Sequence, residues 1–157
     1  MKVRVEIIDP SDDDEIVIRT SKHTPQIAEL VKKLQEDVSG VQGIKGYKRG
    51  VEYYIDVDSI LFFESEEDAV YAHTEKEMYQ IKQRLYEIET EFAFIFVRIS
   101  KSAIVNFNEI LSIQRNLASA SLISFRQSYK QVYVSRHYYK QLQGRLDERR
   151  HRYSYEK

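Results

Sequence analysis

Apolar and polar residues alternate at the start of the chain, which predicts a strand. Val3, Val5 and Ile7 fall on one face with polar residues between them, the two-residue period of a half-buried strand. A polar turn at 9–14 then leads to an apolar stretch at 15–19, which predicts a second strand.

A helix is predicted directly after these two strands. Thr24 suits the position that caps the helix, and Pro25 suits the first helical position. Apolar residues then recur at helical spacing on one face, at Ile27, Leu30, Val31, Leu34 and Val38. The helix is expected to end at Ser39-Gly40. A unit of about 45 residues is too small for a core of its own, so its apolar faces must pack on the rest of the protein or on another copy.

Three glycines at 43, 46 and 50 mark a change of pattern, after which short strands follow one another. Stretches 51–57, 60–63 and 69–73 are predicted strands, and this close spacing favours a mainly β module. Residues 75–92 fit two alternatives. They allow one continuous helix, or a strand near 78–81 followed by a short helix over 84–92.

Strands are predicted again from Phe94 onward, and a helix closes the chain. The strands cover 94–99, 109–113, 121–125 and 131–135. The last helix is expected from Tyr138, with its apolar stripe at Tyr139, Leu142 and Leu146.

The composition is that of a globular protein of one ordinary domain, with or without a small attachment. The chain has 157 residues, of which 42% are hydrophobic and 31% charged, and it has no cysteine. The lack of cysteine excludes disulfides and thiol nucleophiles and suits the reducing cytoplasm, where we expect the protein. The longest apolar run, at 92–97, is too short to span a bilayer, so no membrane insertion is expected.

Charge is distributed unevenly along the chain. Residues 64–94 hold nine acidic residues against three Lys or Arg, a net charge of −6. Residues 95–157 hold twelve Lys or Arg against four acidic residues, a net charge of +8. A basic C-terminal third suggests a surface that faces a polyanion, although the run at 149–152 also fits a solvated tail.

The motifs of common enzymes are missing from the sequence. It has no Gly-rich phosphate loop, no HExxH and no Gly-x-Ser-x-Gly, and its four histidines lack the spacing of metal ligands. Asp12 to Asp14 fit a turn better than a metal site, and the glutamates near 64–67 have no companion nucleophile. We therefore expect no enzyme activity, no metal and no cofactor.

The segment RISKSAIVNFN at 98–108 places a basic residue between two serines. Ser100 and Ser102 can satisfy free backbone groups, or they can cap a short helix over 103–106. Ile104 and Val105 then anchor the turn, and Lys101 is left pointing outward. A fixed cation beside small hydroxyl groups suits contacts with phosphates and base edges.

A second segment follows the same logic at the end of the last predicted strand. Ser135 can cap the final helix, and Arg136 lies at its start. A helix N-terminus attracts phosphate oxygens, and an arginine can form a two-pronged bond with a guanine edge. The plain alternative for both segments is that the serines are caps and that Lys101 and Arg136 are surface charges.

Four stretches of the chain together indicate a family. They are DSILFFES at 58–65, LYEIE at 85–89, FVRISKSAIVN at 96–106 and VSRHY at 134–138. In this order and spacing they resemble the LytTR family of bacterial DNA-binding domains, for which the third stretch is the best marker. The resemblance covers about residues 47–146, roughly two-thirds of the chain.

The resemblance implies a mainly β fold with short helices, α+β overall, arranged as an elongated stack of small antiparallel sheets. It favours the strand-then-helix alternative for 75–92. It also implies that loops, rather than a recognition helix, contact DNA at three places: the loop Glu66-Glu67-Asp68, Lys101 beside Ser102, and Arg136. The three acidic residues should repel phosphate, so their loop either stays clear of the backbone or accepts a bond from a cytosine amino group.

We expect a lead segment at 1–45, a DNA-binding domain at 46–147 and a basic tail at 148–157. The lead is too short for a receiver domain, so the protein resembles a stand-alone regulator. It could pair two chains on repeated half-sites of double-stranded DNA, or cover one end of the sheets.

The expected function is a sequence-specific transcriptional regulator that reads the major groove through Lys101 and Arg136 on one common edge. Supporting contacts are expected from Arg98, Ser100, Ser102, Ser135, His137 and Lys140. The alternative is a protein-interaction module on a β scaffold, which the twelve tyrosines would suit.

Overall fold

The computed structural model describes residues 16–38 and 42–155, which divide between Ser39 and Gly40 into two compact units. The first unit contains α1 (Pro25–Val38), as the apolar spacing predicts. Thr24 caps it, since its Oγ1 accepts a hydrogen bond from the Ile27 amide at 3.3 Å. The first predicted strand and the aspartate turn lie outside the described residues.

The strand predicted at 15–19 is wrong for the part that the structure describes. Residues 16–20 have no regular secondary structure, and both Ile16 and Val17 are exposed. A strand exists only where a neighbour completes its backbone hydrogen bonds. Residues 16–19 pair with none of the described strands.

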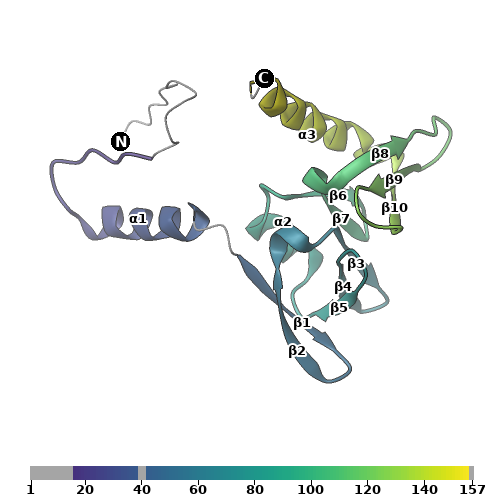
Figure 1. Ribbon diagram of the computed structural model, residues 1–157, viewed down its shortest axis with the longest axis horizontal. Coiled ribbons are helices and arrows are strands. Elements are labelled where there is room, and N and C mark those ends of the chain that lie inside the picture. The colour runs from purple at the N-terminus through teal and green to yellow at the C-terminus, as the bar shows by residue number, and fades with distance from the viewer. Residues whose placement is uncertain (1–15, 39–41, 156–157) are drawn as a thin grey trace. The chain divides into compact units, whose positions relative to one another are not determined.

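The second unit is built from two antiparallel sheets (Figure 1). The larger has the strand order β2-β1-β5-β4-β3-β7-β6, and the smaller the order β10-β9-β8. The strands of the larger sheet are β1 (Gly43–Lys48), β2 (Val51–Asp56), β3 (Phe62–Glu66), β4 (Ala69–His73), β5 (Met78–Ile81), β6 (Phe96–Ser100) and β7 (Ala103–Asn106). Those of the smaller sheet are β8 (Ile110–Gln114), β9 (Ser121–Phe125) and β10 (Gln131–Val134).

Two α-helices and two short 3-10 helices complete the second unit. They are α2 (Leu85–Glu91), α3 (Arg136–Tyr155), η1 (Val57–Ser59) and η2 (Phe107–Glu109). The predicted mainly β class with antiparallel sheets is confirmed, as is the strand-then-helix alternative for 75–92. None of the described helices combines the length and the apolar character needed to cross a lipid bilayer.

The core has two clusters, one on each side of β3. Phe63 points into a cluster with α2 and packs edge to face on Phe96, with ring centroids 5.0 Å apart. Phe62 points to the opposite side and stacks on Phe125 of the smaller sheet at 5.6 Å. Because successive strand residues face opposite sides, both faces of β3 are buried. This explains the unbroken apolar run at 60–63.

Strand β1 was missed by the sequence reasoning, because its glycines resemble a boundary. Gly46 lies opposite Tyr53 in the β1–β2 hairpin and is buried. A Cβ at this position would lie 2.5 Å from Ile55 Cδ1 and 2.8 Å from Tyr79 Cβ. Arg49 and Gly50 both have positive φ, 51° and 74°, as a two-residue hairpin turn of type I′ requires. The glycines therefore serve the strand and its turn.

The short helix considered at 103–106 is also wrong. These residues form β7, which pairs with β6 on one side and with β3 on the other. All four are buried, and Ile104 lies opposite Phe63 in the sheet. A helix there would leave one edge of β3 without a partner, because β4 covers only the other edge. The serine alternative is correct instead, since Ser100 Oγ accepts a hydrogen bond from the Ser102 amide at 3.2 Å.

The final helix begins at Arg136, as the Ser135-Arg136 segment predicts and two residues before the start expected at Tyr138, and it continues through Tyr155. It therefore extends into the basic segment at 148–157. Two arginines hold α3 on the domain. Arg145 donates to the Ala93 carbonyl at 2.6 Å, and Arg149 donates to the Phe107 carbonyl at 2.6 Å. Leu142 is fully buried on the same helix.

Candidate nucleic-acid interface

Three connections of the second unit lie side by side because backbone hydrogen bonds join them. The Ser65 amide at the end of β3 donates to the Ser102 carbonyl in the β6–β7 turn at 2.8 Å. The Ser135 amide before α3 donates to the Ile99 carbonyl of β6 at 2.8 Å. The β6–β7 turn is thus tied to the β3–β4 turn through one bond, and β6 is tied to the start of α3 through the other.

Lys101 and Arg136 are the cations on two of these connections. Lys101 is an exposed residue of the β6–β7 turn, and Arg136 is the exposed first residue of α3. Within the described residues, neither side chain has an ion-pair or hydrogen-bond partner. Both charges are therefore available to an anionic ligand without breaking an internal contact.

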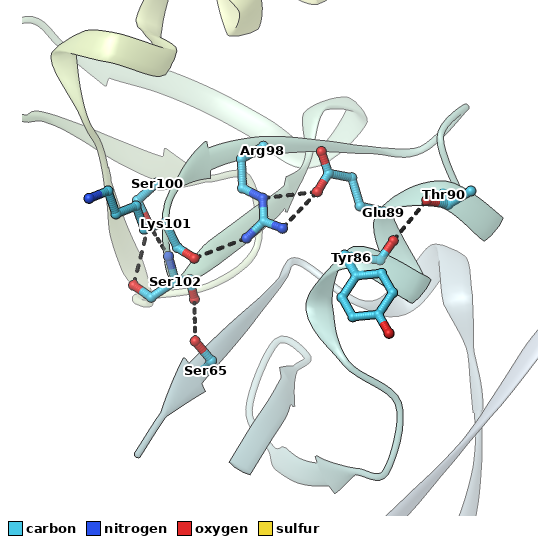
Figure 2. A network of polar contacts seen from close by, with 8 residues as sticks. All are labelled: Ser65, Tyr86, Glu89, Thr90, Arg98, Ser100, Lys101 and Ser102. Atoms are coloured by element: carbon cyan, nitrogen blue, oxygen red, sulfur yellow. Dashed lines mark hydrogen bonds and ion pairs between the residues drawn. The ribbon is translucent and has the colours of Figure 1, made fainter. Parts of the chain in front are cut away.

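The β6–β7 turn is held from inside by Arg98 (Figure 2). Arg98 donates from Nε to Glu89 Oε2 at 2.9 Å, and its Nη2 forms an ion pair with the same oxygen at 2.8 Å. It also donates from Nη1 to the Lys101 carbonyl at 3.0 Å. Ser100 and Ser102 close the turn with their own contacts, as their hydroxyl oxygens lie 3.4 Å apart. Arg98 is thus directed inward, and Lys101 outward.

The start of α3 differs from the predicted serine cap. Ser135 Oγ is buried and has no hydrogen-bond partner among the described residues, so its side chain does not cap the helix. The Ser135 carbonyl accepts from the Tyr138 amide at 3.1 Å instead. His137 and Lys140 are exposed on the first turns of α3 beside Arg136, which adds polar and basic groups to this end of the helix.

The β3–β4 turn contributes negative charge to the same edge. Glu66, Glu67 and Asp68 are all exposed, and Glu67 has a positive φ of 56° at the tight turn. Burial and the nearby Glu66 raise the pKa of Glu64, the residue two positions earlier on β3. The electrostatic character of the edge is therefore mixed, with one acidic turn beside two basic connections.

A shallow cavity of about 430 Å³ lies between the β3–β4 turn, the β6–β7 turn and the connection from β5 to α2. Its walls include Asp68 of the β3–β4 turn, Lys82 and Arg84 of the β5–α2 connection, and Arg98 and Lys101. Sequence reasoning did not single out Lys82, Arg84 or Glu89. The LYEIE stretch did mark the helix that carries Glu89, but its period gave no sign of a contact nine residues away.

Comparison with known proteins decides the family. The model of the LytTr DNA-binding domain matches residues 52–147, which is more than half of the chain. The chain belongs to the LytTR family of DNA-binding domains. This confirms the resemblance seen in the four sequence stretches and assigns residues 52–147 of the second unit to a DNA-binding family.

A solved LytTr domain has the same fold. It is a LytTr DNA-binding domain from Bacillus cereus, 23% identical, with a TM-score of 0.62. The match covers 68% of this chain and 98% of that domain. The fold of the second unit is therefore that of a LytTR domain.

Relatives of nearly the same extent occur in Staphylococcus aureus. An uncharacterized HTH-type transcriptional regulator of strain NCTC 8325 is 29% identical over 129 residues, covering 79% of this chain and 86% of the relative. One from strain MRSA252 is 28% identical over the same length. In the described part of this LytTR protein, strands separate all three α-helices, so no two of them form a helix-turn-helix.

Proposed function

We propose that this LytTR protein is a sequence-specific transcriptional regulator that acts in the bacterial cytoplasm and reads the major groove of double-stranded DNA through its loops. The observation that carries the proposal is a pair of exposed cations, Lys101 and Arg136, on connections joined to β6, whose side chains have no partner in the described part of the chain. The names of the Staphylococcus aureus relatives support a role in transcription.

Arg136 is the residue that we expect to select a base. Its planar guanidinium can donate two parallel hydrogen bonds to O6 and N7 of guanine, which a lysine cannot reproduce. It also opens a helix of 20 residues, whose N-terminal amides favour a phosphate nearby. Lys101 approaches the bases or the phosphates from the neighbouring turn. His137 and Lys140 are candidates for phosphate contacts.

The remaining predicted contact residues act mainly from within the protein. Ser100 shapes the β6–β7 turn through its bond with the Ser102 amide, and Ser102 binds Ser65 through its carbonyl. Ser135 places the start of α3 through its amide and its carbonyl. Arg98 holds the Lys101 carbonyl. These residues fix where the two cations lie, and an exposed hydroxyl such as that of Ser102 can add a phosphate contact.

The acidic β3–β4 turn adds discrimination rather than affinity in this proposal. A carboxylate close to phosphates is repelled, whereas a carboxylate in the groove can accept a hydrogen bond from the cytosine amino group. Glu66, Glu67 and Asp68 are thus expected to weaken binding in general. One of them can favour a single base pair.

The lead unit is proposed to pair two chains on repeated half-sites. In α1, Ile27, Leu30, Val31 and Leu34 form an apolar stripe that remains partly exposed. A second copy of the helix would cover it. Replacing Leu30 and Leu34 together by glutamate should then yield monomers in sedimentation equilibrium, whereas Lys32→Glu on the exposed side should leave the dimer intact. A wild-type protein that is monomeric at high concentration would contradict pairing.

Selection of bound duplexes from a random pool tests the main proposal. The expected result is recovery of a short repeated motif, bound with an affinity that falls steeply as salt rises, because Lys and Arg displace counterions from DNA. Recovery of no motif would contradict sequence-specific binding. An affinity for duplex that is insensitive to salt would favour an aromatic protein-interaction surface instead.

A further inference from the structure

We infer that Glu89 is a positioning residue for DNA recognition, which holds Arg98 so that Arg98 can fix the backbone of the Lys101 turn. The inference rests on the proposed function, because it assigns Glu89 a role in orienting Lys101 for contact with DNA. Glu89 itself lies on α2, on none of the three connections.

The first step is the geometry of Arg98. Its guanidinium uses three separate nitrogens for two partners, with Nε and Nη2 on Glu89 Oε2 and Nη1 on the Lys101 carbonyl (Figure 2). The Arg98 side chain is only 15% exposed, and that of Glu89 is 34% exposed. Hydrogen bonds between charged groups in such partly shielded surroundings are among the stronger ones in proteins. Glu89 therefore restricts the guanidinium to one orientation.

The second step is what the guanidinium does to the turn. The two carbonyls of the β6–β7 turn are both engaged, since that of Ser102 accepts from the Ser65 amide and that of Lys101 accepts from Arg98. The peptide planes on either side of Ser102, the residue after Lys101, are thereby fixed. If Arg98 is released, the plane between Lys101 and Ser102 loses one of its two contacts and keeps only the bond from the Ser102 amide to Ser100 Oγ. The direction of the Lys101 side chain is then less defined.

The third step is the rigidity of the support. Glu89 directly follows Ile88, which is fully buried, and α2 packs against the core of the larger sheet. On the other side, Ile99 is fully buried next to Arg98, and its carbonyl holds the Ser135 amide. A site precise enough for base recognition requires such a supporting contact on rigid elements. The Glu89–Arg98 pair joins α2 to the segment of β6 that places both cations.

Removing the charge of Glu89 should change DNA binding in opposite directions under the two explanations, overall charge and positioning, which makes the inference testable. Glu89 is negative, so its neutralisation should strengthen binding to DNA if only the overall field mattered. A positioning role predicts weaker and less selective binding when the charge is removed. Glu87 provides the matched control, because it is an exposed glutamate of the same helix without a partner among the described residues.

The experiment compares Glu89→Gln with Glu87→Gln in the full chain, on the duplex motif selected by the wild-type protein and on random duplex. Glu89→Gln should lower the affinity for the motif about tenfold and change the affinity for random duplex little, because it weakens one charge-assisted contact. Glu87→Gln should bind the motif as well as the wild type or slightly more tightly. Motif binding by Glu89→Gln as tight as that by Glu87→Gln would overturn the inference.

A readout without DNA separates this inference from the proposed function. Hydrogen exchange of the Ser65 and Ser102 amides reports directly on the closed turn, because the first donates to the Ser102 carbonyl and the second to Ser100 Oγ. Glu89→Gln should raise their exchange rates several-fold while the Ile123 amide in the smaller sheet stays protected. Unchanged exchange at both amides would overturn the positioning role even if the wild-type protein selects a motif. If the wild type selects none, raised exchange would still support the contact, and only the proposed function would fail.

Discussion

Arg136 and Lys101 differ at the residue scale in what their side chains can distinguish. A guanidinium presents a rigid fork that matches guanine, whereas an ammonium is a mobile point charge. The two residues lie on different connections, yet β6 contacts both connections through Ile99 and Arg98. Base selection is therefore expected to depend mostly on Arg136, and general affinity on both.

Replacing Arg136 by alanine tests this division. The change should cost about 1–3 kcal/mol on the selected motif and relax the preference at one position. Arg136→Lys should keep the salt dependence but lose the same preference. Arg126→Ala is the control, because Arg126 is an exposed arginine outside the three connections. Titration of each variant against the motif and single-base variants gives the answer, and an equal loss on every sequence would contradict base readout.

His73 makes a second prediction at this scale, on stability. Its ring stacks on Phe62 with centroids 4.2 Å apart, and burial, with a smaller effect of Lys130, lowers the pKa of His73 to about 4. A Glu64 carboxylate oxygen lies 3.9 Å from His73 Nε2, but burial raises the pKa of Glu64. The carboxyl group therefore gives little support to a charged imidazolium. His73 is therefore neutral in the folded protein at pH 7.

The unfolded chain takes up a proton at His73 below about pH 6.5, and the folded chain only below about pH 4. Stability should thus fall between these values, by about 1–2 kcal/mol after solvent screening is allowed for. His73→Gln removes this contribution, while the carboxylates, with raised pKa values at Asp58 and Glu64, remain in both proteins. Denaturant unfolding of both proteins at pH 7 and pH 4.5 measures the difference. An equal loss of stability from pH 7 to pH 4.5 in the wild type and in His73→Gln would contradict a neutral imidazole at His73.

At the element scale, sequence patterns fail for strands that form only because they pair with residues far away in the chain. Local patterns were sufficient to predict β2, β4 and α1, from the stretches 51–57 and 69–73 and from the helical spacing of apolar residues. The β7 strand looked like a helix start, because Ser100 and Ser102 suit a cap equally well. Its strand form is set by pairing with β3, some forty residues earlier in the chain.

The same limit applied to the site. Lys101 and Arg136 could be found from local sequence, since each stands beside a serine at the end of an apolar strand. The hydrogen bonds that bring their connections together could not be predicted in this way, because they join residues far apart in the chain, Ser65 to Ser102 and Ile99 to Ser135. The resemblance to the LytTR family supplied the missing long-range information for 75–92.

The β1–β2 hairpin gives a prediction for an element. Gly46→Ala should destabilise the protein by about 1–3 kcal/mol, because the new methyl would meet Tyr79 Cβ, which cannot move without its strand. Gly144→Ala in α3 is the matched control, as no atom lies within 4 Å and alanine is the better helix former by about 1 kcal/mol. Thermal unfolding should move in opposite directions for the two variants. A tolerated Gly46→Ala would contradict the close packing of β1.

At the scale of the whole molecule, the two sheets of the second unit serve mainly to hold three short connections together. β3 faces both core clusters, and its end is bonded to the β6–β7 turn. β6 in turn contacts α3 through Ile99. In the proposed function, this domain presents rigid turns to DNA, whereas a helix-turn-helix regulator presents a helix. At this edge, the acidic residues of the β3–β4 turn lie beside the connections that carry Lys101 and Arg136.

Mapping of backbone amide shifts by nuclear magnetic resonance tests the central claim most directly. The full chain is titrated with the selected duplex, and then with a scrambled duplex at higher salt. The account predicts the largest shift changes at residues 66–68, 100–102 and 135–137. All three sets of changes should be absent when the scrambled duplex is added instead. Changes concentrated on β2 or on the β8–β9 strands, with these three connections unaffected, would contradict it.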